Sequence, residues 1–210
     1  MNFSVMKSAA VTAAFLGIAT SASAAVTITG SVTGVSVNNT DPGLVIEASP
    51  VAFPSFTLNN VGDFRDFTVL TIGTSEGTVN FPDDFQPRPI SVAFSFSSPN
   101  GAAGAPIGGT STGFVDFNLF GSCGVLAGGC GSATFGAPTQ FSFSQGGRFS
   151  VALSNVTFTT PGSANVTGRF TFVTAPVPEP STWALMLLGF GAIGAAMRSP
   201  ARRRTSVSYA

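Results

Sequence analysis

The feature that most restricts the fold of this chain is a strict alternation of apolar and small polar residues. The segment from Ile90 to Ser97 reads ISVAFSFS, so large apolar side chains occupy every second position along most of it. Side chains two positions apart lie on the same face of a β-strand, whereas a helix would need a period of about 3.6 residues. The segment is therefore predicted to be a half-buried antiparallel strand.

The same alternation recurs elsewhere between residues 25 and 174, and no helical period interrupts it. The clearest further strands are predicted at 141–144, 149–154 and 166–172, and weaker ones at 26–37, 43–48, 67–72 and 114–120. Turns are predicted where proline or glycine supplies a fixed or a positive φ, at 41–43, 98–101 and 161–162. The Gly-, Ala- and Pro-rich segment 98–113 is expected to be a long loop, and 123–130 a second irregular segment.

Phenylalanine supplies the material for a core. Of the 21 phenylalanines, 18 lie between residues 25 and 174, and this region has no Trp or Tyr. Each buried phenylalanine contributes about 1.5 to 3 kcal/mol, enough for two sheets to pack face to face. We therefore expect an all-β fold, an antiparallel β-sandwich or jelly roll, flanked by an N-terminal signal peptide and a short C-terminal transmembrane helix.

The N-terminal residues 1–24 have the three parts of a secretory signal peptide. Lys7 precedes an apolar run from Ala9 to Ala19, and the small residues Ala22 and Ala24 suit signal peptidase. We predict cleavage before Ala25. An N-terminal membrane anchor is the alternative, but the run is too short to cross a hydrocarbon core of about 30 Å.

The two cysteines, Cys123 and Cys130, bracket a turn-rich segment. Export permits oxidation, so we predict a disulfide that closes this small loop. A redox or metal pair is the alternative. The spacing differs from Cys-x-x-Cys, and the chain has no His to complete a zinc site.

The amino-acid composition of the chain changes after Thr174. A Pro-rich linker is predicted at 175–182, an apolar membrane helix at 183–197 and a basic cytoplasmic tail at 198–210. Fifteen helical residues rise only about 22 Å, which is short for a bilayer. These features predict a membrane-engaged tail, with residues 25–174 forming the exported domain.

This C-terminal region closely resembles the PEP-CTERM sorting signal. The resemblance rests on a Pro-Glu-Pro motif, an aromatic residue, a short Gly-rich apolar helix and terminal arginines. The corresponding residues are Val177, Pro178, Glu179, Pro180, Trp183, Arg198, Arg202, Arg203 and Arg204. The match covers about the last 30 residues of the chain.

The resemblance implies a Gram-negative bacterium and recognition by an exosortase, an integral-membrane cysteine protease. The protein would engage the inner membrane transiently, lose its tail near the Pro-Glu-Pro motif, and pass to the cell surface or extracellular matrix. Proteins with this signal resemble components of biofilm and exopolysaccharide-producing systems. A permanent single-span anchor that is never processed is the alternative.

Catalytic and metal-binding candidates are few. The absence of His, and of Lys between residues 25 and 174, excludes the usual hydrolase triads, Ser-Lys dyads and Schiff-base chemistry in the body. Paired carboxylates remain, as Asp63 with Asp66 and Asp83 with Asp84, and both pairs are also weak calcium candidates. Neither pair has the spacing of a known calcium loop, so we expect no cofactor, no metal and no enzymatic activity.

The net charge of residues 25–174 argues against nucleic acid as a partner. Residues 25–174 hold eight acidic residues and four arginines, a net charge of −4. Nucleic-acid affinity depends on clustered cations, so no nucleic acid is expected.

Two functions then compete. One is a structural protein of the surface or matrix, and the other is a glycan-binding adhesin module, which could depend on calcium. Sugar platforms usually use Trp or Tyr, which the body lacks. The structural function is therefore preferred.

Overall fold

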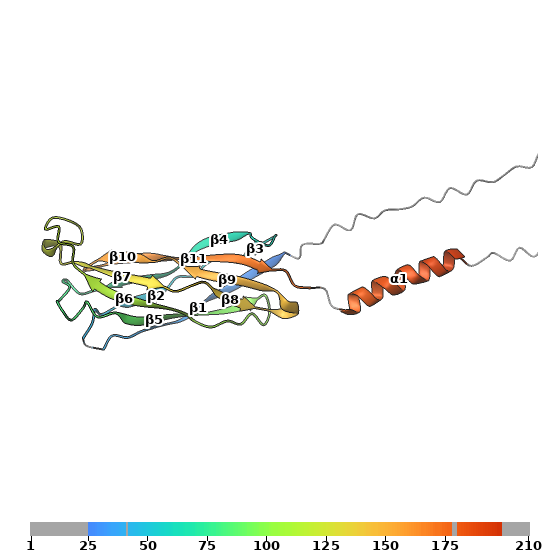
Figure 1. Ribbon diagram of the computed structural model, residues 1–210, viewed down its shortest axis with the longest axis horizontal. Coiled ribbons are helices and arrows are strands. Elements are labelled where there is room, and N and C mark those ends of the chain that lie inside the picture. The colour runs from blue at the N-terminus through green and yellow to red at the C-terminus, as the bar shows by residue number, and fades with distance from the viewer. Residues whose placement is uncertain (1–24, 41, 178–179, 199–210) are drawn as a thin grey trace, which may run out of the picture.

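The computed structural model describes residues 25–40, 42–177 and 180–198, and within them the chain forms two curled antiparallel sheets and a C-terminal helix (Figure 1). The predicted signal peptide, residues 1–24, lies outside the described residues. In spatial order, one sheet comprises β10 (Val156–Thr159), β7 (Cys130–Phe135), β6 (Ile107–Phe114), β5 (Arg88–Ser98), β1 (Val26–Val37) and β3 (Phe56–Leu58). The other comprises β2 (Glu47–Pro50), β4 (Phe64–Thr74), β11 (Gly162–Thr174), β9 (Arg148–Leu153) and β8 (Thr139–Ser142). The predicted all-β sandwich is confirmed.

The alternation that predicted β5 corresponds to its burial. Ile90, Val92 and Phe96 are buried, whereas Ser95 and Ser97 are exposed. The predicted strands at 149–154 and 166–172 behave in the same way and form β9 and most of β11. A period of two is therefore a sound guide wherever one face of the sheet carries large apolar residues.

The core is built around phenylalanine, as the composition predicts. Phe170, on β11, is fully buried, and five other phenylalanine rings have centroids 5.0 to 6.4 Å from its own. Three of these rings come from strands of the opposite sheet, Phe56 on β3 and Phe94 and Phe96 on β5. Phe170 thus joins the two sheets at the centre of the sandwich.

Two sequence predictions about residues 98–120 are wrong. Segment 98–113 is not a loop throughout, because β6 begins at Ile107, which is buried beside Ser111. Between Ile107 and Phe114 its residues are Gly, Ser and Thr, so the strand is defined by its pairing with β5 and β7 and not by an apolar pattern. The strand predicted at 114–120 ends at Phe114, and Phe117 and Phe120 beyond it are almost completely exposed.

Other strands lie outside the predicted ranges. The chain forms β2 at Glu47–Pro50, where 43–48 was expected, and β3, β7 and β10 were not predicted. The last three are short or rich in Gly, Ser and Thr, and they are defined by their partners in the sheet.

The outer face of the six-stranded sheet is covered with hydroxyl groups. Arg88, at the start of β5, is the one charged residue in the six strands. Hydroxyl pairs connect neighbouring strands, as in Thr110 with Thr134 at 2.9 Å. Further exposed hydroxyl residues lie along the sheet, among them Thr27, Ser31, Ser95, Ser97, Thr157 and Thr159.

Candidate functional site

The C-terminal segment leaves the sandwich from the end of β11. Ala175 packs partly against the core, and the Val177 backbone N–H donates a hydrogen bond to the Gln145 carbonyl at 3.0 Å. The body is therefore held in place up to the residue before the Pro-Glu-Pro motif. Pro178 and Glu179 lie outside the described residues.

The helix α1 (Pro180–Arg198) follows the motif. It has 19 residues, beginning three residues before the predicted start at Trp183 and ending one residue after Met197. Proline favours the first helical position because it has no N–H to leave unpaired there. The helix rises about 28 Å, close to the thickness of a hydrocarbon core.

The surface of α1 is mostly apolar and exposed. None of the residues from Ser181 to Arg198 is buried, and by length and composition this segment could cross a membrane. Trp183 is exposed near its start, and Arg198 is its last residue. A long exposed helix whose residues are mostly apolar is costly in water and favourable in lipid.

The processing residues predicted from sequence lie at the borders of the described chain. Ala25, predicted to follow the signal-peptide cut, is exposed, and β1 begins at the next residue. Ala22, Ala24, Arg202, Arg203 and Arg204 lie outside the described residues.

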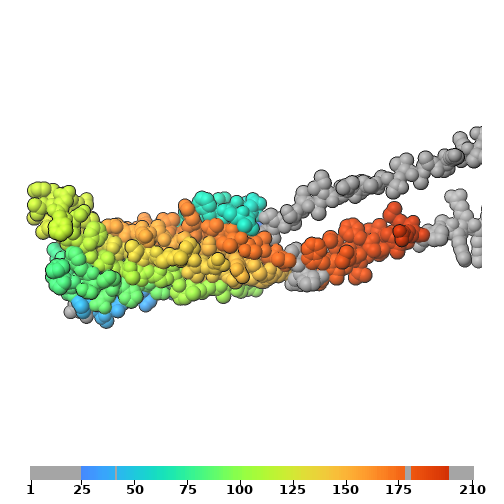
Figure 2. Space-filling model, viewed as in Figure 1, coloured from blue at the N-terminus to red at the C-terminus, as the bar shows by residue number. Residues whose placement is uncertain are grey.

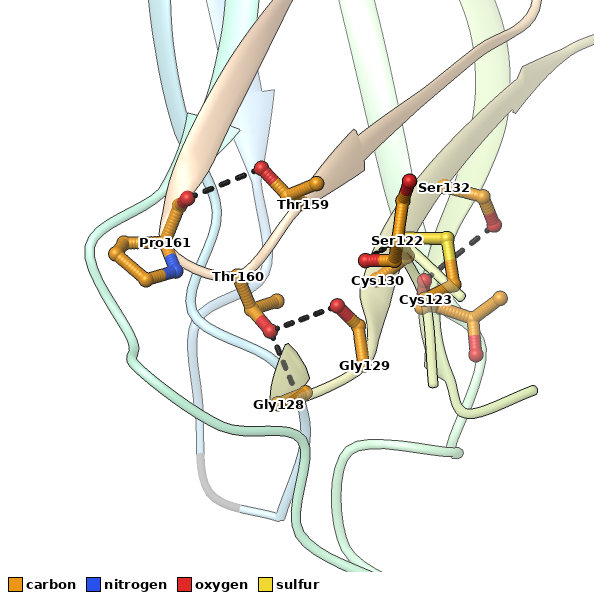
Figure 3. The surroundings of a disulfide bond; sticks show 10 residues. Ser122, Cys123, Gly128, Gly129, Cys130, Ser132, Thr159, Thr160 and Pro161 are labelled. Atoms are coloured by element: carbon orange, nitrogen blue, oxygen red, sulfur yellow. Dashed lines mark hydrogen bonds between the residues drawn. A yellow bond between two sulfur atoms is a disulfide. The ribbon is translucent and has the colours of Figure 1, made fainter. Parts of the chain in front are cut away.

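The predicted disulfide is confirmed. The Sγ atoms of Cys123 and Cys130 are bonded, and Cys130 is buried at the start of β7 (Figure 3). The bond closes the loop from Cys123 to Cys130. This loop is the second half of the segment Val115–Gly129, here called the apolar lobe, which leads from β6 to β7. The Thr160 hydroxyl, at the end of β10, lies 2.8 and 3.0 Å from the carbonyl oxygens of Gly128 and Gly129 and fixes the base of the lobe (Figure 3).

The first predicted carboxylate pair is divided between two local structures. Asp63 accepts hydrogen bonds from the backbone N–H groups of Asn59 and Asn60, at 3.0 and 2.9 Å, and so stabilises a turn. Asp66 accepts two hydrogen bonds of 2.8 Å from Arg169, and this guanidinium lowers the pKa of the Asp66 carboxyl. Both carboxylates already have protein partners.

The second pair belongs to a different cluster, which sequence reasoning missed in part. Asp84 is buried and accepts a hydrogen bond of 2.7 Å from the Asn80 N–H. Glu76 interacts with both Asp84 and Asp83. Burial is the main cause that raises the pKa of Glu76; the Val45 N–H, donating at 2.9 Å, opposes the rise, and the negative charges of Asp84 and Asp83 add to it. Nothing in the sequence around Glu76 indicates this role.

These carboxylates do not assemble a metal site in the described chain. Across residues 25–40, 42–177 and 180–198, no group of three or more His, Cys, Asp or Glu side chains is placed to hold a metal ion. A cleft of about 600 Å³ lies beside Asp83. Its other lining residues are Pro42, Asn80, Phe81, Pro82, Gln86, Pro87 and Arg88.

The cleft combines an exposed aromatic ring with polar groups. Phe81 is 80 % exposed and packs edge-on against Phe85, with ring centroids 5.3 Å apart. The Arg88 Nε is buried and has no hydrogen-bond partner among the described residues. Sequence reasoning assigned neither residue to a site, since nothing in their local pattern distinguishes them from core or surface residues.

Comparison with known proteins identifies one region. The family model of the PEP-CTERM protein-sorting motif matches residues 176–204. No curated protein and no solved structure matches the chain. The tail is thus a PEP-CTERM sorting motif, which indicates an extracellular protein processed by exosortase, a membrane protein.

Proposed function

We propose that this exosortase-sorted extracellular protein is a structural component of the cell surface or extracellular matrix, associated with biofilm or exopolysaccharide. The proposed division of the chain is a signal peptide at 1–24, an exported β domain at 25–174, a linker at 175–182, a sorting helix at 183–197 and a basic cytoplasmic tail at 198–210. Proteins with a PEP-CTERM signal are typically surface proteins rather than enzymes.

The observation that carries the proposal is the position of the fold between the two processing regions. β1 begins at Val26, directly after the proposed signal-peptide cut, and β11 ends at Thr174, before the Pro-Glu-Pro motif. Among the described residues, every buried core residue lies between Val26 and Phe172. Both ends can therefore be removed without removing any strand or core side chain of the described sandwich.

The helix α1 supports a membrane-bound precursor. Before processing, it would lie in the inner membrane of a Gram-negative bacterium, with Trp183 at the outer interface and the arginines from Arg198 onward in the cytoplasm. Removal of the tail near Pro180 would release the body to the surface or matrix. Without removal, the body would remain anchored.

The outer face of the six-stranded sheet supports a matrix role. Its exposed Ser and Thr hydroxyl groups can donate and accept hydrogen bonds, and its strands contain one charged residue. Such a surface can adhere to a neutral hydroxyl-rich polymer without depending on ionic strength. The phenylalanine core needs no ligand to stabilise it.

The intact mass of the protein from the producing cells and from their medium tests processing. We expect a chain that begins at Ala25, ends between Pro178 and Pro180, and is two hydrogens lighter than its reduced form. Replacing Pro178 and Glu179 with alanine should leave the tail in place, and replacing Pro50, within β2, is the matched control. A wild-type mass that retains residues 183–210 would refute sorting by cleavage.

The matrix role needs a separate measurement. We expect most of the processed protein to sediment with extracellular polysaccharide and to remain there in 0.5 M salt. Lysine substitutions at Ser95 and Thr110, on the hydroxyl face, should make retention weaker or salt-dependent, whereas lysine at the exposed Ser163 on the other sheet should not. Processed protein found free in the medium would contradict a matrix role while leaving sorting intact.

The cleft favours a second candidate, a glycan-binding module of the same matrix. An exposed Phe81 ring beside Asn80, Gln86 and Arg88 offers an apolar face next to hydrogen-bonding groups, a combination that suits a sugar ring. Binding of the body to the producer's own polysaccharide, lost on Phe81→Ala but retained in Phe117→Ala, would favour this function. If chelation of calcium abolished this binding, the glycan-binding function would be calcium-dependent.

A further inference from the structure

The apolar lobe, Val115–Gly129, exposes large apolar side chains of the kind that the sandwich elsewhere buries in its core. Phe117 is 100 % exposed and Phe120 is 89 % exposed. Leu119, Val125 and Leu126 are each more than half exposed. Scattered exposed apolar residues are ordinary, but a cluster on one projecting segment marks a contact surface.

The lobe is a projection and not a groove. It stands out from the end of the sandwich opposite the end at which β11 leads to the C-terminal segment (Figure 1), and Figure 2 shows it as a separate yellow-green projection. A convex apolar tip suits insertion into a soft apolar phase better than docking against a flat protein surface.

The backbone of the lobe bonds extensively to itself. The Asp116 N–H donates to the Cys123 carbonyl at 2.7 Å, and the Gly124 N–H donates to the Gly121 carbonyl at 2.9 Å. Further bonds join Gly121 to Asn118, Ala127 to Gly124 and Gly129 to Gly124. Backbone groups that are already paired lower the cost of entering an environment without water.

The lobe is also held in shape before any contact. The disulfide bonds Cys123, within the lobe, to Cys130 at the start of β7, and Gly128 and Gly129, with φ of 83° and 88°, turn the chain back into this strand. The Cβ of any side chain at Gly128 would clash with the Gly77 carbonyl oxygen. The lobe would therefore lose little conformational entropy on binding.

The charge of the lobe predicts whether its insertion depends on anionic lipids. Its single charged residue is Asp116, exposed at its base, and it contains no Lys or Arg. Insertion would therefore depend on apolar burial and not on anionic headgroups.

We propose that the apolar lobe is a membrane-insertion tip, which places Phe117, Phe120 and Leu126 among the acyl chains of a lipid bilayer. This contact is separate from the one made by α1, because the lobe and the exit of β11 lie at opposite ends of the sandwich (Figure 1). It would persist after the tail is removed and would hold the body on a lipid surface.

The body can be tested without its tail. In the part of the chain that the structure describes, all buried core residues lie between Val26 and Phe172, and α1 is not buried against them. Residues 25–177 therefore contain the complete core and should fold as an oxidised domain, which circular dichroism and the intact mass would verify.

The assay is co-flotation of residues 25–177 with neutral phosphatidylcholine vesicles. We expect the body to float, and the double variant Phe117→Ser, Phe120→Ser to bind about tenfold more weakly for each phenylalanine removed. Phe81→Ser is the matched control, since Phe81 is 80 % exposed on a different loop, and its binding should be unchanged. Raising the salt from 0.1 to 0.5 M should have no effect.

A depth measurement makes the test independent of affinity. The body contains no Trp, so Phe117→Trp introduces a single reporter. We expect its emission to shift to the blue and to be quenched by lipids brominated on their acyl chains, whereas Phe81→Trp should be quenched little. Failure of the folded wild type to float, or equal flotation of the double variant, would overturn the proposal. So would dimerisation that depends on Phe117 and Phe120 without vesicle binding, which would make the lobe a contact between copies.

Discussion

Replacing Phe170 with alanine should destabilise the body by about 4 kcal/mol. Truncation of a buried phenylalanine to alanine costs about 3 to 5 kcal/mol, through lost burial and the cavity left behind. The upper half of this range is expected because four of the five neighbouring rings come from strands of both sheets, and the fifth, Phe53, from the segment between β2 and β3. The walls of the cavity cannot close without moving one sheet against the other.

The measurement is urea unfolding of residues 25–177, followed by far-UV circular dichroism because the body has no Trp or Tyr. With a slope of about 2 kcal/mol per molar urea, the midpoint should fall by about 2 M. Phe170→Leu keeps part of the volume and should cost about 1 to 2 kcal/mol, which remains measurable if the alanine variant does not fold. Phe117→Ala, at a fully exposed ring, should leave the midpoint unchanged. Equal midpoints for Phe170→Ala and Phe117→Ala would refute a core organised around Phe170.

Three further predictions concern the cross-link and two carboxylates. Replacing Cys123 and Cys130 with serine should lower the unfolding free energy by about 2.5 kcal/mol, the loop-entropy value for so small a loop, and urea unfolding of the variant against the oxidised body measures it. Glu76 has a pKa raised above its ordinary value, so the folded body holds this proton more tightly than the unfolded chain does, and its contribution to stability falls as the pH rises from below 4.5 through the folded pKa. Glu76→Gln should remove that fall, and an unchanged pH profile would contradict it. Asp66 has the opposite sign: its pKa is lowered by Arg169, so the pair stabilises above pH 3.8 and the gain is lost as the pH falls through the folded pKa. Because the pair is exposed, Asp66→Asn should cost less than about 1 kcal/mol at pH 7, and its effect should shrink as the pH falls below 3.8.

The strands that could be predicted share one property. In β5, β9 and β11, large apolar residues alternate with Ser, Thr, Ala or Arg, because one face of each strand is buried in the phenylalanine core. In β6, the inward positions include Gly109 and Ser111, which give no apolar signal. A Cβ at Gly109 would clash with the Thr134 carbonyl oxygen, so the neighbouring strand, and not local propensity, requires the glycine.

The candidate sites divide in a similar way. The Pro-Glu-Pro motif with its apolar helix and the cysteine pair are local in sequence, and both could be predicted. The cleft at Arg88, the interactions of Glu76 with Asp83 and Asp84, and the exposure of Phe117 could not, because each depends on segments that only the packed sheets bring together or leave uncovered.

The sequence by itself therefore determined the all-β class, the cross-link and the sorting tail, since period, cysteine spacing and a contiguous motif are properties of neighbouring residues. The tertiary structure decided which phenylalanines form the core and which project from the apolar lobe. Phe170 and Phe117 are chemically identical, and both were placed in predicted strands. The first is buried because strands from both sheets surround it, and the second is exposed because the chain leaves the sheet at Phe114, before reaching it.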